Sequence, residues 1–159
     1  GSTVRDTQEI TVLSWNVNGL LDRIKRGAFL HSIKPYGPLV VLLQETHLLG
    51  TRCNMLDRYS YDRVLNAGFV SGSRAIAILF RRSFPFTLVG SLSDPLGRFV
   101  AAWGLLEGKP YNFMSVYVPP QMYTLTFQDL GKTLLDHPSG ITVLGGDWNA
   151  MLDRELDFS

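Results

Sequence analysis

Three short stretches of this 159-residue sequence place two polar residues two positions apart, directly after apolar runs. The pairs are Asn16 and Asn18, Glu45 and His47, and Asp147 and Asn149. In an extended chain, residues i and i+2 point to the same side, so each pair would present two polar groups to one face. If the three strands are neighbours, their carboxyl ends would bring six polar side chains together, at the edge where open α/β sheets bind ligands.

The oxygen donors of this set favour Mg²⁺ or Mn²⁺ over zinc. Glu45 and Asp147 supply carboxylates, the asparagines supply amide oxygens, and the set holds no thiolate. Gly145 and Gly146, just before the last pair, would allow a sharp turn or a close approach of substrate. The alternative is that each polar pair only begins a loop, because Asn, Asp and Gly favour turns. Three pairs in the same register argue against that alternative.

Short apolar runs flanked by turn residues predict the strands that would carry these pairs. We expect buried strands at 10–15, 39–43, 75–80, 99–106 and 141–144, a strand at 111–118 paired to 99–106 across a turn at 107–110, and a short strand near 61–65. Helices are predicted over 20–34 and over 127–136, where Thr126 and Asp129 fit a capping box. Helices that link buried strands predict a mixed α/β fold.

The composition is typical of one well-buried globular domain. Hydrophobic residues make up 45% of the chain and charged residues 18%, and the net charge is +1, so a nucleic acid would need a local basic patch. No apolar run approaches the ~18 residues of a membrane helix, and no signal peptide is recognisable, so we expect no membrane association. The single cysteine, Cys53, excludes an internal disulfide and fits a reducing compartment, which predicts an intracellular protein.

Six motifs stand in the order found in the endonuclease/exonuclease/phosphatase superfamily: WNVNG, QETHL, SGSRAIAIL, GRFVAAWGLL, VYVPP and GGDWNAMLD. Over residues 8–158 the chain resembles in particular the apurinic-endonuclease-like domain in the reverse-transcriptase polyprotein of non-LTR (LINE-type) retrotransposons. The resemblance implies a two-sheet α/β sandwich of the DNase I type, with mixed sheets and outer helices. It implies a Mg²⁺-dependent DNA endonuclease, and it favours the nucleus over the cytoplasm.

The resemblance also implies a role for each matched residue. Asn16 and Glu45 would hold the metal, and Asn16 would also orient the phosphate. Tyr117 would contact the scissile phosphate, Asp147 would activate the attacking water or assist the leaving oxygen, and Asn149 would hold the phosphate and orient that acid. Candidate phosphate or DNA contacts are Asn18, His47, Arg74 and Arg98.

Two side chains have structural alternatives that we favour. His47 could position phosphate, but a structural hydrogen bond suits a histidine at this place better. Tyr61, within the long stretch 50–74, could stack on a base, whereas membership of a packed cluster is the more common role of such a tyrosine.

Gly1 and Ser2 resemble an expression-tag scar, which leaves residues 3–159 as one endonuclease/exonuclease/phosphatase-like domain, truncated at its C-terminus. The resemblance implies a further portion with a terminal SDH motif, whose histidine is essential to catalysis in the family. We therefore expect an impaired DNA endonuclease. The alternative is a catalytically inactive, domesticated remnant that serves as a binding or dimerisation module. A truncated sandwich would leave an apolar sheet face uncovered, so we also expect a homodimer through that face.

Overall fold

The computed structural model describes residues 10–48, 52, 56, 61–68, 75–136 and 140–147. None of the helices in this part of the chain is long and apolar enough to cross a membrane. In chain order the elements are β1 (Val12–Asn16), α1 (Arg23–Ile33), η1 (Lys34–Tyr36), β2 (Val40–Gln44), β3 (Tyr61–Ala67), β4 (Ile76–Arg81), β5 (Phe86–Ser93), β6 (Phe99–Leu106), β7 (Lys109–Tyr117), η3 (Pro120–Met122), α2 (Tyr123–Asp136) and β8 (Ile141–Asp147).

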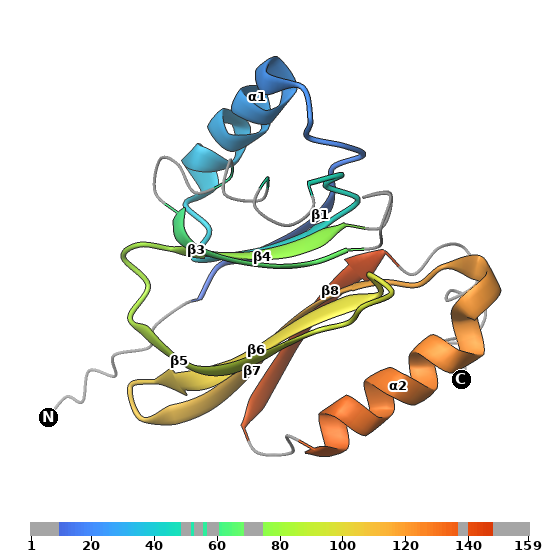
Figure 1. Cartoon of the computed structure of the whole chain (residues 1–159). Helices are drawn as coiled ribbons and strands as arrows, with labels where there is room; N and C mark the ends of the chain where they lie inside the picture. Colours follow the sequence, from blue (N-terminus) through green and yellow to red (C-terminus); the bar gives the residue numbers. More distant parts are fainter. Residues whose placement is uncertain are drawn as a thin grey trace, which may run out of the picture.

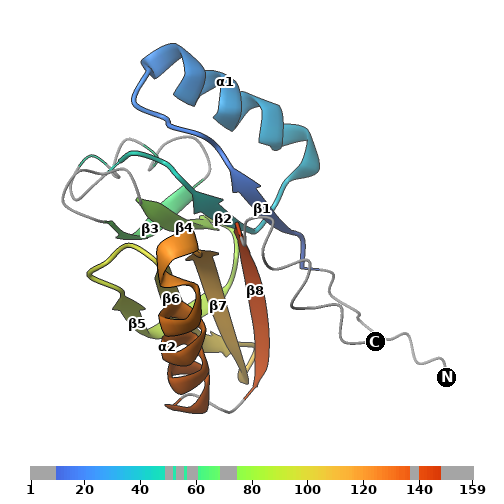
Figure 2. The same cartoon turned by 90° about the vertical axis from the view of Figure 1, so that its right-hand side faces the viewer.

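These elements form four layers, with two sheets packed face to face between the helices (Figure 1). Sheet A has the strand order β1-β2-β4-β3, and sheet B has the order β5-β6-β7-β8. Helix α1 covers the outer face of sheet A, and α2 lies along the outer face of sheet B (Figures 1 and 2). The arrangement confirms the predicted mixed α/β sandwich with outer helices.

Sheet A contains a parallel pair, because α1 carries the chain back from β1 to β2. Asn16 lies opposite Gln44 in the register, so both strands end at the same edge. The helix begins after Asp22, whose Oδ1 accepts a hydrogen bond of 2.9 Å from the amide of Ile24. Gly37 ends the following 3₁₀ turn in the left-handed conformation, with φ of 54°, and redirects the chain into β2.

Sheet B is an antiparallel meander of β5, β6 and β7, extended by β8 in parallel to β7. Leu106 pairs with Lys109, so the predicted turn is a two-residue connection. Its residues Glu107 and Gly108 have φ of 53° and 76°, as tight hairpins require. Helix α2 crosses from β7 back to β8, and the register places Tyr117 opposite Asp147 at the shared carboxyl edge of both strands.

The core between the sheets is dominated at one end by four phenylalanines. Their ring centroids lie 5.3 to 6.4 Å apart, and none is more than 4% exposed. Arg63 of β3 lies with its guanidinium 5.2 Å from the ring centroid of Phe80 and donates hydrogen bonds to the carbonyls of Phe84 and Phe86. We call this cluster, formed by Arg63, Phe80, Phe84, Phe86 and Phe113, the aromatic end.

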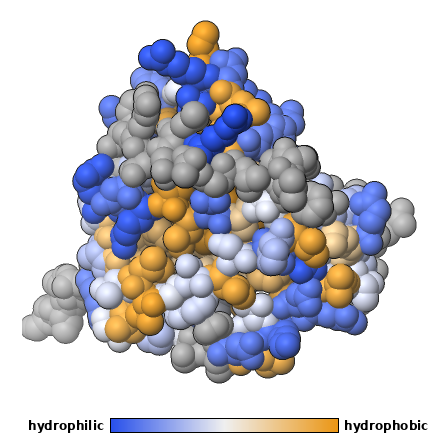
Figure 3. All heavy atoms as spheres, viewed as in Figure 1, coloured by the Kyte–Doolittle hydropathy of each residue, from blue (hydrophilic) through white to orange (hydrophobic). Residues whose placement is uncertain are grey.

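Each sheet buries its inner face against the other, so the expectation of an uncovered sheet face is wrong for the described residues. The outer face of sheet A is buried by α1 in a second apolar cluster. Apolar side chains are instead exposed to solvent on two strands at sheet edges, β1 and β8. Trp15 of β1 is 47% exposed, and Ile141 and Leu144 of β8 are 55% and 41% exposed. On the face seen in Figure 3, hydrophobic side chains are interspersed with polar ones over the sheets.

Most strand predictions are confirmed, as β2, β3, β4, β6 and β7. The stretches 10–15 and 141–144 also form strands, but their predicted burial is wrong, because β1 and β8 are the outermost strands of their sheets. Strand β5 was not predicted. Its sequence FTLVGSLS exposes most of its residues and has no continuous apolar run, so pairing with β6, rather than its own pattern, makes it a strand.

Both helices were predicted, but the capping box proposed for the second is wrong. Helix α2 begins at Tyr123, because η3 leads directly into it. Thr126 therefore lies inside the helix, fully buried, and its hydroxyl has no hydrogen-bond partner among the described residues. Instead of capping a helix, Asp129 forms an ion pair with Arg98, with 2.7 Å between Asp129 Oδ2 and Arg98 Nη2.

Candidate active site

The ladder between β1 and β2 continues past the ends of the two strands. Backbone hydrogen bonds of 2.6 to 3.0 Å join three amides to three carbonyls: Val17 to Gln44, Gly19 to Glu45 and Leu20 to Thr46. The two segments that follow the strands are therefore held side by side at one edge of sheet A. We call this edge, together with the facing ends of β7 and β8, the strand-end region.

The side chains of Asn16 and Glu45 meet directly at this edge. Asn16 Nδ2 donates a hydrogen bond to Glu45 Oε2, and Asn16 Oδ1 accepts one of 3.0 Å from the amide of Asn18. Both side chains are half-buried. The amide orientation is thus fixed by two contacts, one of them to the carboxylate. Two residues that are 29 positions apart and that the sequence assigns to one metal site are in contact in the structure.

The reason given for this convergence, alternation along extended strands, is wrong for the first two pairs. Asn18, Glu45 and His47 have φ of 51°, 53° and 60°, which lie in the left-handed region rather than in extended chain. Residues other than glycine rarely adopt this conformation, which costs about 1–3 kcal/mol for each residue. The surrounding backbone hydrogen bonds hold it in place, and such locally strained residues cluster at functional sites.

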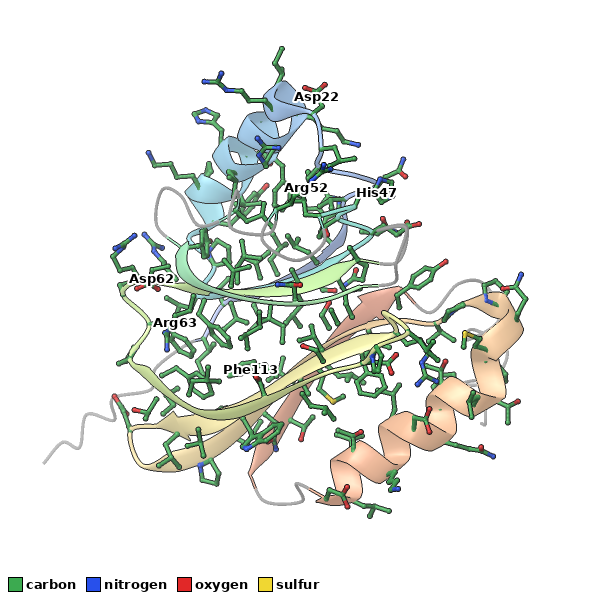
Figure 4. The ribbon with its side chains drawn as sticks, viewed as in Figure 1. Asp22, His47, Arg52, Asp62, Arg63 and Phe113 are labelled. Atoms are coloured by element: carbon green, nitrogen blue, oxygen red, sulfur yellow. The ribbon has the colours of Figure 1, made fainter. Side chains whose placement is uncertain are left out.

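Asn18 and His47 occupy the rim of the strand-end region. The carbonyl of Asn18, an exposed residue, accepts a hydrogen bond of 2.7 Å from Lys25 Nζ. A Cβ at Gly19 would lie only 2.7 Å from His47 Nδ1, so the imidazole packs on the backbone there. The structural hydrogen bond that we favoured for His47 stays a prediction. His47 is labelled beside sheet A in Figure 4.

The end of β8 reaches the strand-end region from the other sheet. A Cβ at Gly145 would lie 2.7 Å from both Leu42 Cδ1 and Ser14 Oγ, so β8 faces β1 and β2 closely at this level. Asn16 and Asp147 each follow two residues later, and the tip of β8 lies directly below β1 in Figure 2. The three strands are therefore not neighbours in one sheet, as assumed. They converge across the sandwich.

The sharp turn predicted at Gly145 and Gly146 is wrong, whereas the close approach of a substrate there stays a prediction. Both lie within β8 rather than in a turn. A Cβ at Gly146 would lie 2.5 Å from the carbonyl oxygen of Val116, and Gly145 has the contacts to sheet A just described. The two glycines allow β8 to approach its neighbours closely, and this approach brings Asp147 to the edge shared with Asn16.

Tyr117, the last residue of β7, is half-buried beside Asp147. Its backbone amide donates a hydrogen bond of 2.7 Å to the carbonyl of Arg98. The contact of its hydroxyl with a phosphate in the strand-end region stays a prediction. The described part of Asp147 is its backbone, so the direction of its carboxylate stays a prediction. Arg74 and Asn149 lie outside the described residues.

Arg98 is not presented to a ligand, contrary to the predicted DNA contact. The residue is 4% exposed, and its guanidinium donates hydrogen bonds of 2.7 and 3.0 Å to Asp94. A third contact of 2.7 Å reaches Asp129 of α2. The hydrogen bond to Asp94 raises the pKa of Arg98 above its ordinary value, so the side chain stays charged. A buried charge with two carboxylate partners is a structural anchor for α2.

Sequence reasoning missed a second set of polar residues beneath the site. Gln44 is 1% exposed and Ser115 is fully buried, and Gln44 Nε2 donates a hydrogen bond of 3.1 Å to Ser115 Oγ. The contact joins β2 of sheet A to β7 of sheet B. The available signal was a glutamine at the end of the apolar run VVLLQ, because a buried amide requires partners.

The donor set fits a hard divalent cation. Glu45 offers a carboxylate in contact with the amide of Asn16, and the predicted second carboxylate is Asp147. In the part of the chain that the structure describes, no group of three or more His, Cys, Asp or Glu side chains could hold a metal. A small number of protein ligands that all bind through oxygen suits Mg²⁺ or Mn²⁺ better than zinc. Mg²⁺ and Mn²⁺ retain water molecules and also bind phosphate oxygens.

Solved structures with the same fold include a phosphatase and a protein bound to a DNA product. The human Nocturnin catalytic domain with bound sulfate matches with a TM-score of 0.70 and 21% identity, over 89% of this chain and 64% of that one. D. rerio TDP2 complexed with a single-strand DNA product matches with a TM-score of 0.68 and 20% identity, over 88% and 60%. A mannosyl-6-phosphatase from Bacteroides thetaiotaomicron matches with a TM-score of 0.63 and 16% identity, over 89% and 66%. The chain thus spans about two thirds or less of the length of these neighbours.

A family model supplies the assignment that these distant structural matches cannot. The model of the Endonuclease/Exonuclease/phosphatase family matches residues 13–155, which include both sheets and the strand-end region. The chain therefore belongs to the endonuclease/exonuclease/phosphatase family.

Proposed function

We propose that this protein hydrolyses phosphodiester bonds in DNA with the help of Mg²⁺, for which Mn²⁺ could substitute. The observation that carries the proposal is the direct contact between Asn16 and Glu45 at the carboxyl ends of β1 and β2. Tyr117 and Asp147 end their strands at the facing edge of sheet B. The family comprises nucleases and phosphatases, and the DNA product bound by the TDP2 neighbour favours DNA as the substrate.

Each residue of the strand-end region then has a defined task. Glu45 and Asn16 would hold the cation, and the hydrogen bond from Asn16 Nδ2 to Glu45 Oε2 keeps the two side chains together. The bound cation would stabilise the charge that develops on the phosphate. Tyr117 would donate its hydroxyl to a phosphate oxygen, and Asp147 would accept the proton of the attacking water or assist the leaving oxygen. Asn149 would orient that acid, and Asn18, His47 and Arg74 are proposed as further phosphate contacts.

Three finer assignments rest on the motifs alone. We propose a retrotransposon origin of the LINE type, and with it a nuclear location, from the six motifs and their order. We also propose that the 159-residue chain by itself is a weak enzyme. The resemblance implies a catalytic histidine in a motif that these residues do not contain, and loss of a general acid or base costs about 10²–10⁴-fold in rate.

A plasmid assay tests the proposal. Nicking of supercoiled DNA by this chain should require Mg²⁺ and should be lost in Glu45→Gln and in Asp147→Asn. The matched control is Glu107→Gln, because Glu107 has the same φ of 53° as Glu45 but lies in the exposed turn between β6 and β7. Nicking that persists in both site variants would come from a contaminant and would refute the assignment. Equal loss in the Glu107 control would point to damage of the fold.

The exposed apolar residues on the outermost strands support a second candidate function, a binding or dimerisation module without catalysis. Trp15 is 47% exposed beside a groove of about 320 Å³ that Phe29 and Lys25 of α1 also line. Apolar grooves of this kind mark interaction sites. This function would be favoured if light scattering finds a dimer at micromolar concentration that forms with or without Mg²⁺. Trp15→Arg should dissociate that dimer. A monomer at all concentrations would exclude the homodimer.

A further inference from the structure

A buried glutamine joins the two sheets directly beneath the candidate site. Gln44 Nε2 donates hydrogen bonds of 3.1 Å to Ser115 Oγ and of 3.2 Å to the carbonyl of Leu42, and it lies 3.4 Å from Ser14 Oγ. Ser115 Oγ in turn donates a hydrogen bond of 2.9 Å to the carbonyl of Leu43. Hydrogen bonds therefore run between the sheets in both directions. We call these contacts the Gln44–Ser115 link.

The link lies close to the four central residues of the proposed chemistry, Asn16, Glu45, Tyr117 and Asp147. On sheet A, Gln44 immediately precedes Glu45 and lies opposite Asn16 in the register. On sheet B, Ser115 lies two residues before Tyr117 and opposite Gly145, which itself lies two residues before Asp147. The link is thus a direct hydrogen-bonded connection between the sheet that would hold the cation and the sheet that would contact the phosphate.

Stability alone does not explain an amide at this position. The four residues before Gln44 in β2 are apolar and buried, and a leucine would continue the pattern without a polar group to satisfy. Apolar contacts are non-directional, so they hold two sheets together without fixing how far one has shifted along the other. Hydrogen bonds weaken steeply with distance and angle, and they therefore fix the relative position of the strands that they join.

We propose that Gln44, acting through Ser115, is a positioning residue that sets the distance between the Asn16–Glu45 pair and the ends of β7 and β8. This proposal rests on the proposed function, since it concerns the same site. It makes a specific statement about the two sheets. Removal of the link leaves the cation-holding residues of sheet A intact, but it releases the residues of sheet B from their place opposite the cation.

The first experiment measures this coupling without requiring hydrolysis. Mg²⁺ is titrated into ¹⁵N-labelled chain, and the amide shifts of Thr46 on sheet A and of Val116 and Tyr117 on sheet B are followed. In Gln44→Leu, the Mg²⁺ affinity read at Thr46 should change by less than about twofold, whereas the Mg²⁺-induced shifts on sheet B should shrink by about half or more. Ser115→Ala should behave alike, because it removes the acceptor but keeps the bond from Gln44 to Leu42.

The second experiment measures the rate. Both variants should lower kcat for nicking by about ten- to a hundredfold with KM nearly unchanged, because a misplaced group reduces reaction more than binding. The double variant should be no slower than the slower single variant, since both remove one link. The matched control is Asn112→Leu. Asn112 is also a buried amide, but it contacts Thr142 at the opposite end of β7 and β8, and its loss should change neither readout.

The possible failures are distinguishable. If the wild-type chain does not bind Mg²⁺, or if Glu45→Gln leaves its Mg²⁺ affinity unchanged, the proposed function and the positioning role are both overturned. If binding is intact but Gln44→Leu and Ser115→Ala keep the wild-type shifts on sheet B and the wild-type kcat, only the positioning role is overturned. Thermal denaturation identifies the folded variants. Should Gln44→Leu not fold, Ser115→Ala decides, since its smaller change leaves the glutamine with a partner.

Discussion

The two ends of the sandwich join the same two sheets by opposite kinds of contact. At the aromatic end, four phenylalanine rings fill the space between the sheets, and Arg63 donates to two backbone carbonyls across it. In the strand-end region the sheets approach through Gly145 and through the Gln44–Ser115 link. In Figure 4, Asp62, Arg63 and His47 mark the two sides of the molecule.

The difference separates stability from function. Large buried rings contribute most of the free energy that a core supplies, and they place no exact requirement on the ends of the strands. The strand-end region instead contains features that cost free energy: left-handed φ values at Asn18, Glu45 and His47, and a buried amide. Such costs are typical of sites that hold side chains in a fixed arrangement. We therefore expect changes at the two ends to affect different measurements.

The largest loss of stability should follow Phe80→Ala. Phe80 is fully buried and contacts three other rings and the Arg63 guanidinium, so its removal leaves a cavity and should lower the free energy of unfolding by about 3–5 kcal/mol. Urea denaturation measures the loss. The Mg²⁺ affinity of the folded variant should match that of the wild type. Val89→Ala, at a side chain 65% exposed, is the control and should change stability little.

A loss of about 3 kcal/mol should follow Arg98→Met. The substitution leaves Asp94, which is 6% exposed, as a buried charge without its cation. Adding Asp94→Asn should restore part of the stability, because it removes that charge. Since Arg98 is an anchor for α2 rather than a ligand contact, Mg²⁺ affinity should be unchanged. A DNA affinity that falls with Arg98→Met while the free energy of unfolding stays constant would contradict our interpretation.

Gly145→Ala should cost less stability, about 1–3 kcal/mol, but should also disturb the site. The new Cβ would lie 2.7 Å from Leu42 Cδ1 and 2.8 Å from Ser14 Cβ, so β8 must move away from sheet A. Nicking should fall even after correction for the unfolded fraction. The control is Gly131→Ala on α2, where an added Cβ meets nothing within 4 Å and should stabilise the helix slightly. Equal nicking by both variants would show that the approach at Gly145 has no role in activity.

The sequence predicts the fold well where an element carries its own pattern. The apolar runs of β2, β4, β6 and β7 predict strands, and α1 (Arg23–Ile33) lies within the predicted range 20–34. Strand β5 is not predictable from its own residues, because only Phe86 of FTLVGSLS is buried and the neighbouring strand determines its conformation. The start of α2 was misplaced for a related reason: Thr126 has the chemistry of a cap, but the chain before it is already helical.

The meeting of Asn16 and Glu45 agrees with the prediction from the sequence, but the geometry that brings it about was not predicted. Asn16 and Glu45 were assigned to one metal, and they are in contact. Alternation along a strand cannot reveal that Glu45 leaves β2 with a positive φ, or that β8 lies in the other sheet. Arg98 has the same charge as a DNA-binding arginine, and only its contacts with Asp94 and Asp129 show that it is an internal anchor. Partners distant in sequence decide such roles.

The smallest loss of stability is expected for a substitution at Tyr61, the first residue of β3 in sheet A. Tyr61 is 5% exposed, and its hydroxyl donates a hydrogen bond of 2.8 Å to the carbonyl of Pro38. Burial raises the pKa of this hydroxyl above its ordinary value, although Arg81 acts in the opposite direction. The folded state therefore holds the proton more tightly than the unfolded state. The stability from this group is fully present below about pH 10 and is lost as the pH rises beyond it.

Tyr61→Phe tests that pH dependence. The variant should lose about 1 kcal/mol near neutral pH, because the Pro38 carbonyl loses its donor. Above about pH 10 the difference from the wild type should shrink, since only the wild type then has a phenol whose ionisation favours unfolding. Urea denaturation at several pH values measures both free energies. A difference that stays constant or widens at high pH would mean that the Tyr61 hydroxyl is not held protonated by its burial. Nicking below that pH should be unaffected, as the comparison of the two ends requires.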